Sequence, residues 1–237
     1  MFQTILINPI YNVFIFLIGI TNGNVGWAII ILTLGIRILF YPAFSASIKT
    51  QMGMQAVQGE LAEINKVYKD NPEERAKRTG ALFKEKKISP FGGLLAIIVQ
   101  IPVFFALYFA LFREGLPHID TQLLYSFVHA PITVTVVFLG IVNLLGIHNI
   151  VLAFLVAVTQ YGAIQLSLIR SATVPQKLSK EQEATQRMQR TSMLYAMPAV
   201  LGVLAFSFPA AVGLYFITGN IVSMGQELVI RQHMTKK

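Results

Sequence analysis

The sequence predicts an all-α integral membrane protein with five transmembrane helices (N-terminus outside, C-terminus inside), an N-terminal interfacial helix and a cytoplasmic helical hairpin. The composition is 54% hydrophobic and 13% charged over 237 residues, whereas a soluble domain carries about 25% charged residues. Several apolar runs have the length of a membrane-crossing helix, and they lack the short alternating pattern of a barrel. All but two of the 19 basic residues lie in three segments, which the positive-inside rule assigns to the cytoplasm.

The first two elements come from the apolar N-terminal stretch. Residues 1–24 are interrupted by Asn8, Pro9 and Asn12, and polar residues that recur along an apolar helix favour a position in the interface. A spanning helix is the alternative. Residues 25–45 are predicted to form the first transmembrane helix, which runs inward and carries one full charge.

Residues 46–90 are the one substantial soluble segment. Apolar residues recur at helical spacing from Met52 to Val67, and Asp70-Asn71-Pro72 is a strong signal for a turn and a helix start. Basic and acidic residues are mixed, as in a solvated coiled coil. We therefore expect two antiparallel helices, of about 22 and about 15 residues, in a cytoplasmic hairpin. A passive linker is the alternative, but it would not sustain the apolar period.

The remaining elements follow from the charge distribution. Residues 91–112 are predicted to run outward as the second transmembrane helix, and residues 113–148 to form an extracytoplasmic loop with interfacial apolar segments. An alternative counts 132–147 as a further span, which would place the following basic cluster outside. The other assignments are transmembrane helix 3 (149–169), a cytoplasmic loop (170–191), transmembrane helix 4 (192–208), transmembrane helix 5 (210–231) and a cytoplasmic tail (232–237).

Arg37 is the most informative residue of the chain because it lies inside the apolar run of the first span. A guanidinium cannot lose its proton, so it must be hydrated or paired, or it costs roughly 2.5–3.5 kcal/mol to insert. Thr33 and Tyr41 lie one turn before and after it, on the same face of a continuous helix. This pattern favours a polar, water-accessible face. The alternative is an arginine that snorkels to the headgroups.

Polar side chains also interrupt the other predicted spans. Together with Arg37, Thr33 and Tyr41, they are candidates to line one hydrated cavity. The alternative is that these side chains hold neighbouring helices together by hydrogen bonds. The candidates on the other spans are Gln100, Gln160, Gln165, Asn220 and Ser223.

Nothing in the chain points to enzyme chemistry. It contains no phosphate-binding loop, zinc-protease or serine-hydrolase motif. It has no cysteine, and its four histidines are scattered singly. We therefore expect no enzymatic activity, no cofactor and no metal site. The net charge of +8 is explained by the topology, so no specific nucleic-acid partner is expected.

Five pieces of the sequence carry a family resemblance in their order along the chain. They are PIYNVFIFLIGI, LTLGIRILFYP, MQAVQGELAEINKVYKDNPEE with the following ISPFGG, QIPVFFALYFAL, and YAMPAVLGVLAFSFPAAVGLYFITGNIVSMGQ. This ordered set, over residues 9–231, resembles the YidC family of membrane protein insertases, with its mitochondrial and chloroplast relatives. The resemblance implies that Arg37 is the groove arginine, and that Gln160 or Gln165 is the polar position of the third span. Phe216 would supply an aromatic contact where the family often has tryptophan.

The resemblance implies a multi-pass insertase and chaperone of the bacterial plasma membrane. Such a protein moves short hydrophilic segments of nascent proteins through an amphiphilic, cytoplasm-open groove and releases their helices into lipid. The implied partners are nascent membrane proteins, membrane lipids, a Sec-type translocon and the ribosome, and a monomer is expected to suffice. The alternatives are a small anion channel or transporter, and a membrane assembly scaffold without insertion activity.

Overall fold

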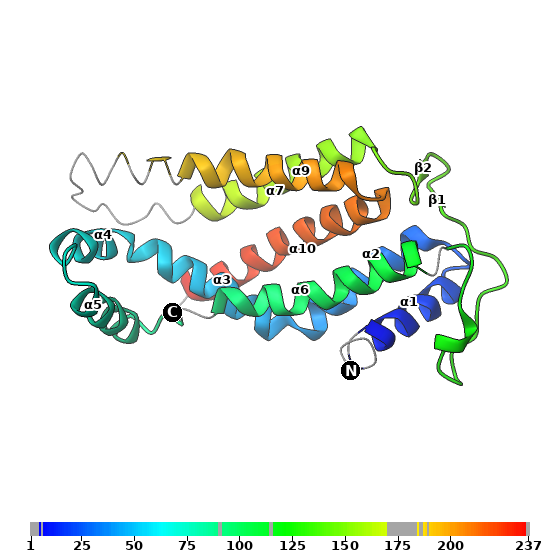
Figure 1. The fold of residues 1–237 in the computed structure, drawn as a ribbon, viewed down its shortest axis with the longest axis horizontal. Coiled ribbons are helices and arrows are strands. Elements are labelled where there is room, and N and C mark those ends of the chain that lie inside the picture. Colours follow the sequence, from blue (N-terminus) through cyan, green and yellow to red (C-terminus); the bar gives the residue numbers. More distant parts are fainter. Residues whose placement is uncertain are drawn as a thin grey trace.

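The structure is a computed structural model that describes residues 7–89, 92–113, 116–169 and 190–235, together with Ile5, Ala184, Arg187 and Met188. Helices make up nearly all of the regular structure, which confirms the predicted all-α class. Figure 1 shows most of them running along the long axis of the molecule. Helices α4 and α5 lie at one end of this bundle (the hairpin end), and residues 116–149 lie at the other (the loop end).

The N-terminal part contains α1 (Asn8–Ile20), α2 (Val25–Leu39) and α3 (Tyr41–Ala56). Helix α1 packs on α2 near the loop end (Figure 1). Asn24 caps α2, because its side-chain oxygen accepts a hydrogen bond of 3.1 Å from the backbone N–H of Trp27.

The predicted continuous helix over 25–45 is wrong. Helix α2 ends at Leu39, and α3 begins at Tyr41 with a bend of 73° between the two. Pro42 explains the break, because proline has no N–H to continue the helical ladder and its ring clashes with the preceding turn. As a consequence, Tyr41 does not share a helical face with Thr33 and Arg37.

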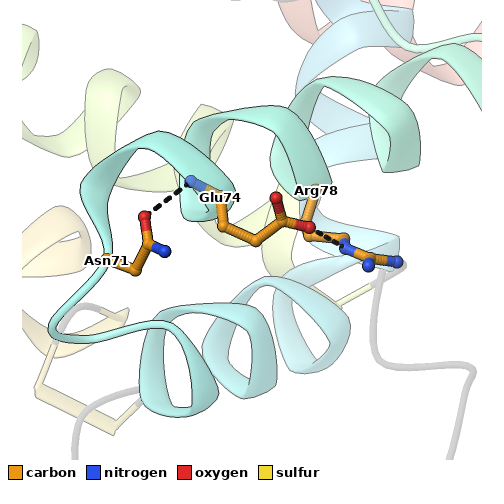
Figure 2. Close-up of polar contacts among 3 residues, drawn as sticks. All are labelled: Asn71, Glu74 and Arg78. Carbon is orange, nitrogen blue, oxygen red and sulfur yellow. Dashed lines mark hydrogen bonds and ion pairs between the residues drawn. The ribbon is translucent and has the colours of Figure 1, made fainter.

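The predicted hairpin segment contains α4 (Gln58–Val67) and α5 (Pro72–Glu85). A break at the buried Val57 separates α4 from α3, so the expected arm of about 22 residues is two helices. In Figure 2, the Asn71 side chain caps α5 by accepting from the Glu74 N–H at 3.1 Å. Arg78 donates to Glu74 at 2.8 Å, and this hydrogen bond raises the pKa of Arg78.

The loop end follows α6 (Gly92–Tyr108) and a π-helical turn (Phe109–Arg113). It contains a 3-10 turn (Thr121–Leu123) and an antiparallel hairpin of β1 (Val137–Phe138) and β2 (Val142–Asn143). Thr135 pairs with the turn before α2, donating to the Gly23 carbonyl at 2.7 Å and accepting from Val25 at 3.2 Å. The alternative of a helical span over 132–147 is therefore wrong, since so short a hairpin would leave its edge groups unpaired in lipid.

The C-terminal part contains α7 (Ile150–Ile169), a π-helical turn (Ser192–Ala196), α9 (Met197–Ser207) and α10 (Ala210–Thr235). Helix α7 packs on α9 and α10, and α10 packs in turn on α2. The largest apolar core lies toward the loop end, where buried side chains of α1, α2, α6 and α10 meet those of the loop, among them Phe138 and Leu144.

Within the described ranges, α7 contains a stretch, Ile150–Leu168, that is long and apolar enough to cross a membrane. The bent pair α2 and α3 passes the same test if the two helices count as one span. Asn8–Ile20, Ile98–Leu111 and Ser192–Ser207 are shorter apolar helices. The number of five spans and their orientation remain predictions.

Candidate functional site

Arg37 lies in the last turn of α2, between α3 and α10. Its guanidinium carbon is 4.2 Å from the centroid of the Phe44 ring, in a cation–π arrangement. Gly219 of α10 lies beside the charged group, since a Cβ at this position would stand 3.4 Å from a guanidinium nitrogen, about van der Waals contact. Gln226 donates to the Arg37 backbone carbonyl at 3.2 Å, which ties α10 to the end of α2. Among the described residues, no carboxylate forms an ion pair with Arg37.

A pocket with about 290 Å³ of space for the centres of water molecules opens beside Arg37 (the larger pocket). Its walls come from α2, α3, α6, α7 and α10. Most of its lining residues are polar or charged, but apolar atoms supply the larger part of the surface, so the lining is amphiphilic. The lining residues are Arg37, Phe44, Ser47, Ile48, Gln51, Gln100, Gln160, Ala163, Ile164, Ser167, Asn220, Ser223 and Glu227. A polar space between apolar helices can accept hydrophilic chain without leaving its backbone groups unpaired in lipid.

A second, more enclosed pocket lies on the loop-end side of Arg37 (the smaller pocket). It leaves only about 10 Å³ for the centres of water molecules, which is near the minimum for a single water. Thr33, Val103 and Tyr215 are among the residues that line it, and they do not line the larger pocket.

Backbone hydrogen bonds join the loop end to the ends of α9 and α10. The N–H groups of Ala210 and Ala211 donate to the carbonyls of Gly146 and Leu144 at 2.8 and 2.9 Å, and His148 donates to Phe206 at 3.0 Å. A Cβ on Gly26 would collide with the Phe138 ring, so this glycine permits the hairpin to pack directly on α2. No residue of 116–149 lines either pocket.

The structure brings six of the nine predicted site residues to these pockets. Arg37 and Gln100 line both pockets, Gln160, Asn220 and Ser223 line the larger one, and Thr33 lines the smaller one. Between the two candidates on the third span, the lining includes Gln160 and not Gln165. Asn220 also donates to Thr159 at 3.2 Å, so the alternative role of joining helices applies to this side chain as well.

Three predicted residues do not line either pocket. Tyr41 is 41% exposed at the start of α3, because the bend turns it away from Arg37. Gln165 is half-buried on α7. Phe216 packs beside Tyr215, with ring centroids 5.7 Å apart, and against the apolar core clusters.

Sequence reasoning missed the contribution of α3 because it assigned residues 46–90 to a soluble segment and did not consider the apolar Phe44 of the predicted first span as a site residue. Phe44, Ser47 and Gln51 line the larger pocket, and their spacing places them on one face of a helix. That spacing is the signal that would have identified them once α3 was recognised as part of the bundle.

Glu227 and Arg231 form a buried ion pair at the hairpin end of α10. Their closest atoms are 2.7 Å apart, and the side chains are only 10% and 9% exposed. Arg231 also donates to the backbone carbonyl of Ser167 at 2.9 Å. The pair therefore joins α10 to the last turns of α7 beside the larger pocket. Among the described residues, no group of three His, Cys, Asp or Glu side chains is placed to hold a metal ion.

Apolar helices that enclose a pocket with Arg37 and other polar side chains in its lining are typical of a helical membrane protein with a hydrophilic site between its helices. The chain belongs to the 60Kd inner membrane protein family, whose model matches residues 16–237. This confirms the expected membrane location.

Proteins named membrane protein insertase YidC are similar to the chain over nearly its whole length, which confirms the resemblance to that family. The protein from Oceanobacillus iheyensis is 34% identical over 239 residues, which cover 99% of this chain and 85% of that protein. The protein from Pelobacter propionicus is 32% identical over 210 residues, 89% of this chain and 35% of that protein. The protein from Polynucleobacter necessarius is 30% identical over 240 residues, 100% of this chain and 37% of that protein.

Proposed function

We propose that this chain is a multi-pass membrane protein insertase of the bacterial plasma membrane, which works without a cofactor or covalent chemistry. The observation that carries the proposal is the polar pocket of about 290 Å³ beside Arg37, together with the hydrogen-bonded loop end. The names of the relatives support the same activity. In this reading the pocket is a groove that opens toward the cytoplasm and toward lipid and is closed toward the outside.

The groove lowers the cost of taking a hydrophilic segment part-way across the membrane. The polar lining replaces water around the backbone groups of the client, which would otherwise be unpaired in hydrocarbon. Arg37 attracts acidic residues of the client. At about 4 Å this attraction is about 4 kcal/mol at an effective dielectric constant of 20, against about 1 kcal/mol in water.

The driving force comes from the client rather than from the insertase. Its apolar helix leaves the groove for lipid, which stabilises the inserted state by roughly 25 cal/mol per Å² of apolar surface. The membrane potential adds about 2.3 kcal/mol per charge per 100 mV for an acidic tail that moves outward.

The proposed topology has five spans, with the N-terminus outside and α4, α5 and the C-terminus in the cytoplasm, in agreement with the positive-inside rule. The apolar helix Ser192–Ser207, formed by the π-helical turn and α9, is shorter than the roughly 20 residues that cross a typical bilayer. Such short helices favour local thinning of the membrane. The proposed partners are nascent membrane proteins and lipids, with a Sec-type translocon and the ribosome as further partners, and a monomer suffices.

Reconstitution of the purified chain into liposomes tests the proposed activity. With a single-span client that carries a short acidic N-terminal tail, we expect the tail to become protected from external protease, and empty liposomes to show much less protection. Anion flux from the same liposomes in the absence of client would instead support the channel. If the chain neither protects the tail nor conducts anions, both the insertase and the anion channel are contradicted. A membrane assembly scaffold without insertion activity is then the remaining function.

Replacing residues 58–86 by a short Gly-Ser linker is expected to reduce insertion severalfold while the melting temperature of the remaining core changes little. Helix α4 contains no buried residue and α5 contains only Leu82, so few packing contacts are lost. The exchange keeps Gln51, which lines the larger pocket. Insertion and thermal unfolding would be measured on the same preparation. Aggregation of the linker variant would show instead that the hairpin is needed for folding.

A further inference from the structure

The larger and the smaller pocket share three lining residues, Arg37, Phe44 and Gln100. We call these three residues the partition, because they lie where the two pockets meet. The larger pocket extends toward the hairpin end, where Ser167 and Glu227 line it, and the smaller pocket extends toward the loop end, where Val103 and Tyr215 line it. A polar segment that enters the larger pocket therefore meets the guanidinium and the ring before it can reach Thr33.

The bend between α2 and α3 creates this partition. Phe44 follows Arg37 by two helical turns, and on a straight helix the two residues would lie about 10 Å apart along the axis. The 73° bend instead brings the ring to 4.2 Å from the guanidinium carbon. Phe44 is only 5% exposed, so this ring is packed into the wall and not free in the pocket.

The smaller pocket is where a deeper path would run. It continues along α2, α6 and α10 toward the loop end, and its walls include the Thr33 side chain. That hydroxyl donates to the Ile29 carbonyl at 2.7 Å, so it already has a partner while the smaller pocket is closed. Arg37, Phe44 and Gln100, which line both pockets, lie between this space and the larger pocket.

We propose that Phe44 is a positioning residue, which stacks on Arg37 and closes the smaller pocket to the larger one. An acidic client segment that pairs with Arg37 displaces the ring, and the two pockets join into a longer path toward the loop end. The displacement rests on the proposed function, whereas the closure by Phe44 does not and is tested without any client.

The absence of cysteine from the chain allows single thiols to report on each pocket. Thr33→Cys places a thiol in the smaller pocket, and Ser223→Cys places a reference thiol in the larger one. Both would be labelled in lipid nanodiscs with a water-soluble thiol reagent. We expect the thiol at position 33 to react at least roughly tenfold more slowly than the reference, because it depends on opening of the partition.

Phe44→Ala should raise the labelling rate at position 33 roughly tenfold and leave the rate at position 223 within about twofold. Phe44→Tyr is the matched control, because it keeps the ring face and should keep the slow rate. Phe44→Leu retains apolar bulk for folding and removes the ring, so the same rise is expected there. Equal rates at position 33 in the parent chain and in both ring-less variants would overturn the proposal, as would fast labelling in the parent chain.

A peptide with two aspartates near its N-terminus tests the displacement. It should accelerate labelling at position 33, and the same peptide with two asparagines should not. No acceleration by the acidic peptide would overturn the displacement step. Failure of insertion in liposomes would leave the labelling contrast between Phe44 variants unaffected, so the two failures are distinguishable.

Discussion

Arg37→Ala is expected to reduce the insertion of clients with acidic translocated tails by roughly tenfold or more, which corresponds to about 1.4 kcal/mol. Clients with neutral tails should insert nearly as before. The physical reason is that Arg37 lines the polar pocket and has no acidic partner among the described residues, so its charge is available to a client. Insertion into liposomes would be measured for two clients that differ only in aspartate and asparagine residues.

Arg37→Lys is the matched control for this result. It keeps the positive charge and should retain most of the preference for acidic tails, although an ammonium lacks the planar fork that binds a carboxylate in bidentate fashion. If the alanine variant inserts acidic and neutral tails in the same ratio as the parent chain, the electrostatic step is refuted. A polar lining alone would then account for the activity.

Glu227→Ala is expected to lower the free energy of unfolding by about 3–5 kcal/mol, because it leaves Arg231 buried without its carboxylate. The two side chains are almost fully buried and 2.7 Å apart, so little solvent reaches the Arg231 guanidinium in place of the lost carboxylate. The effect would be measured by denaturant or thermal unfolding in detergent micelles. It is much larger than the effect of removing an exposed pair such as Arg78 and Glu74, whose attraction is screened by solvent.

The double variant Glu227→Met with Arg231→Met distinguishes the contribution of the two charges to stability from that of side-chain packing. Replacing both charges by apolar side chains of similar volume is often neutral or stabilising. The double variant does lose the hydrogen bond to the Ser167 carbonyl, at a cost of about 1 kcal/mol. We therefore expect it to be at least roughly 2 kcal/mol more stable than Glu227→Ala. Equal destabilisation of the two variants would show that the side chains matter for shape and not for charge.

Several features could be predicted from composition and pattern because lipid restricts what a chain can do. Backbone groups must pair within helices, so the apolar runs predicted α6, α7, α9 and α10 with few errors at their ends. A charge inside such a run is costly, so Arg37 was identified without any knowledge of its neighbours. The polar residues Gln100, Gln160, Asn220 and Ser223 followed from the same argument and line the larger pocket.

Other features depend on contacts between segments that are far apart in the chain or separated by a bend. The stack of Phe44 on Arg37 requires the 73° turn before α3. The hydropathy of the sequence does not show which apolar ring contacts a charged side chain. Residues 132–147 are apolar enough to suggest a span, but Thr135 finds its backbone partners at the start of α2 instead.

The linear chain specified which runs are apolar enough for lipid and which of them carries a full charge, because transfer costs depend on side chains one at a time. The folded bundle decided which polar groups face the same space, since Arg231, which follows its partner Glu227 by one turn of α10, reaches the Ser167 carbonyl only when α10 packs on α7. Such choices depend on distances of a few ångströms between helices, and no residue encodes them alone.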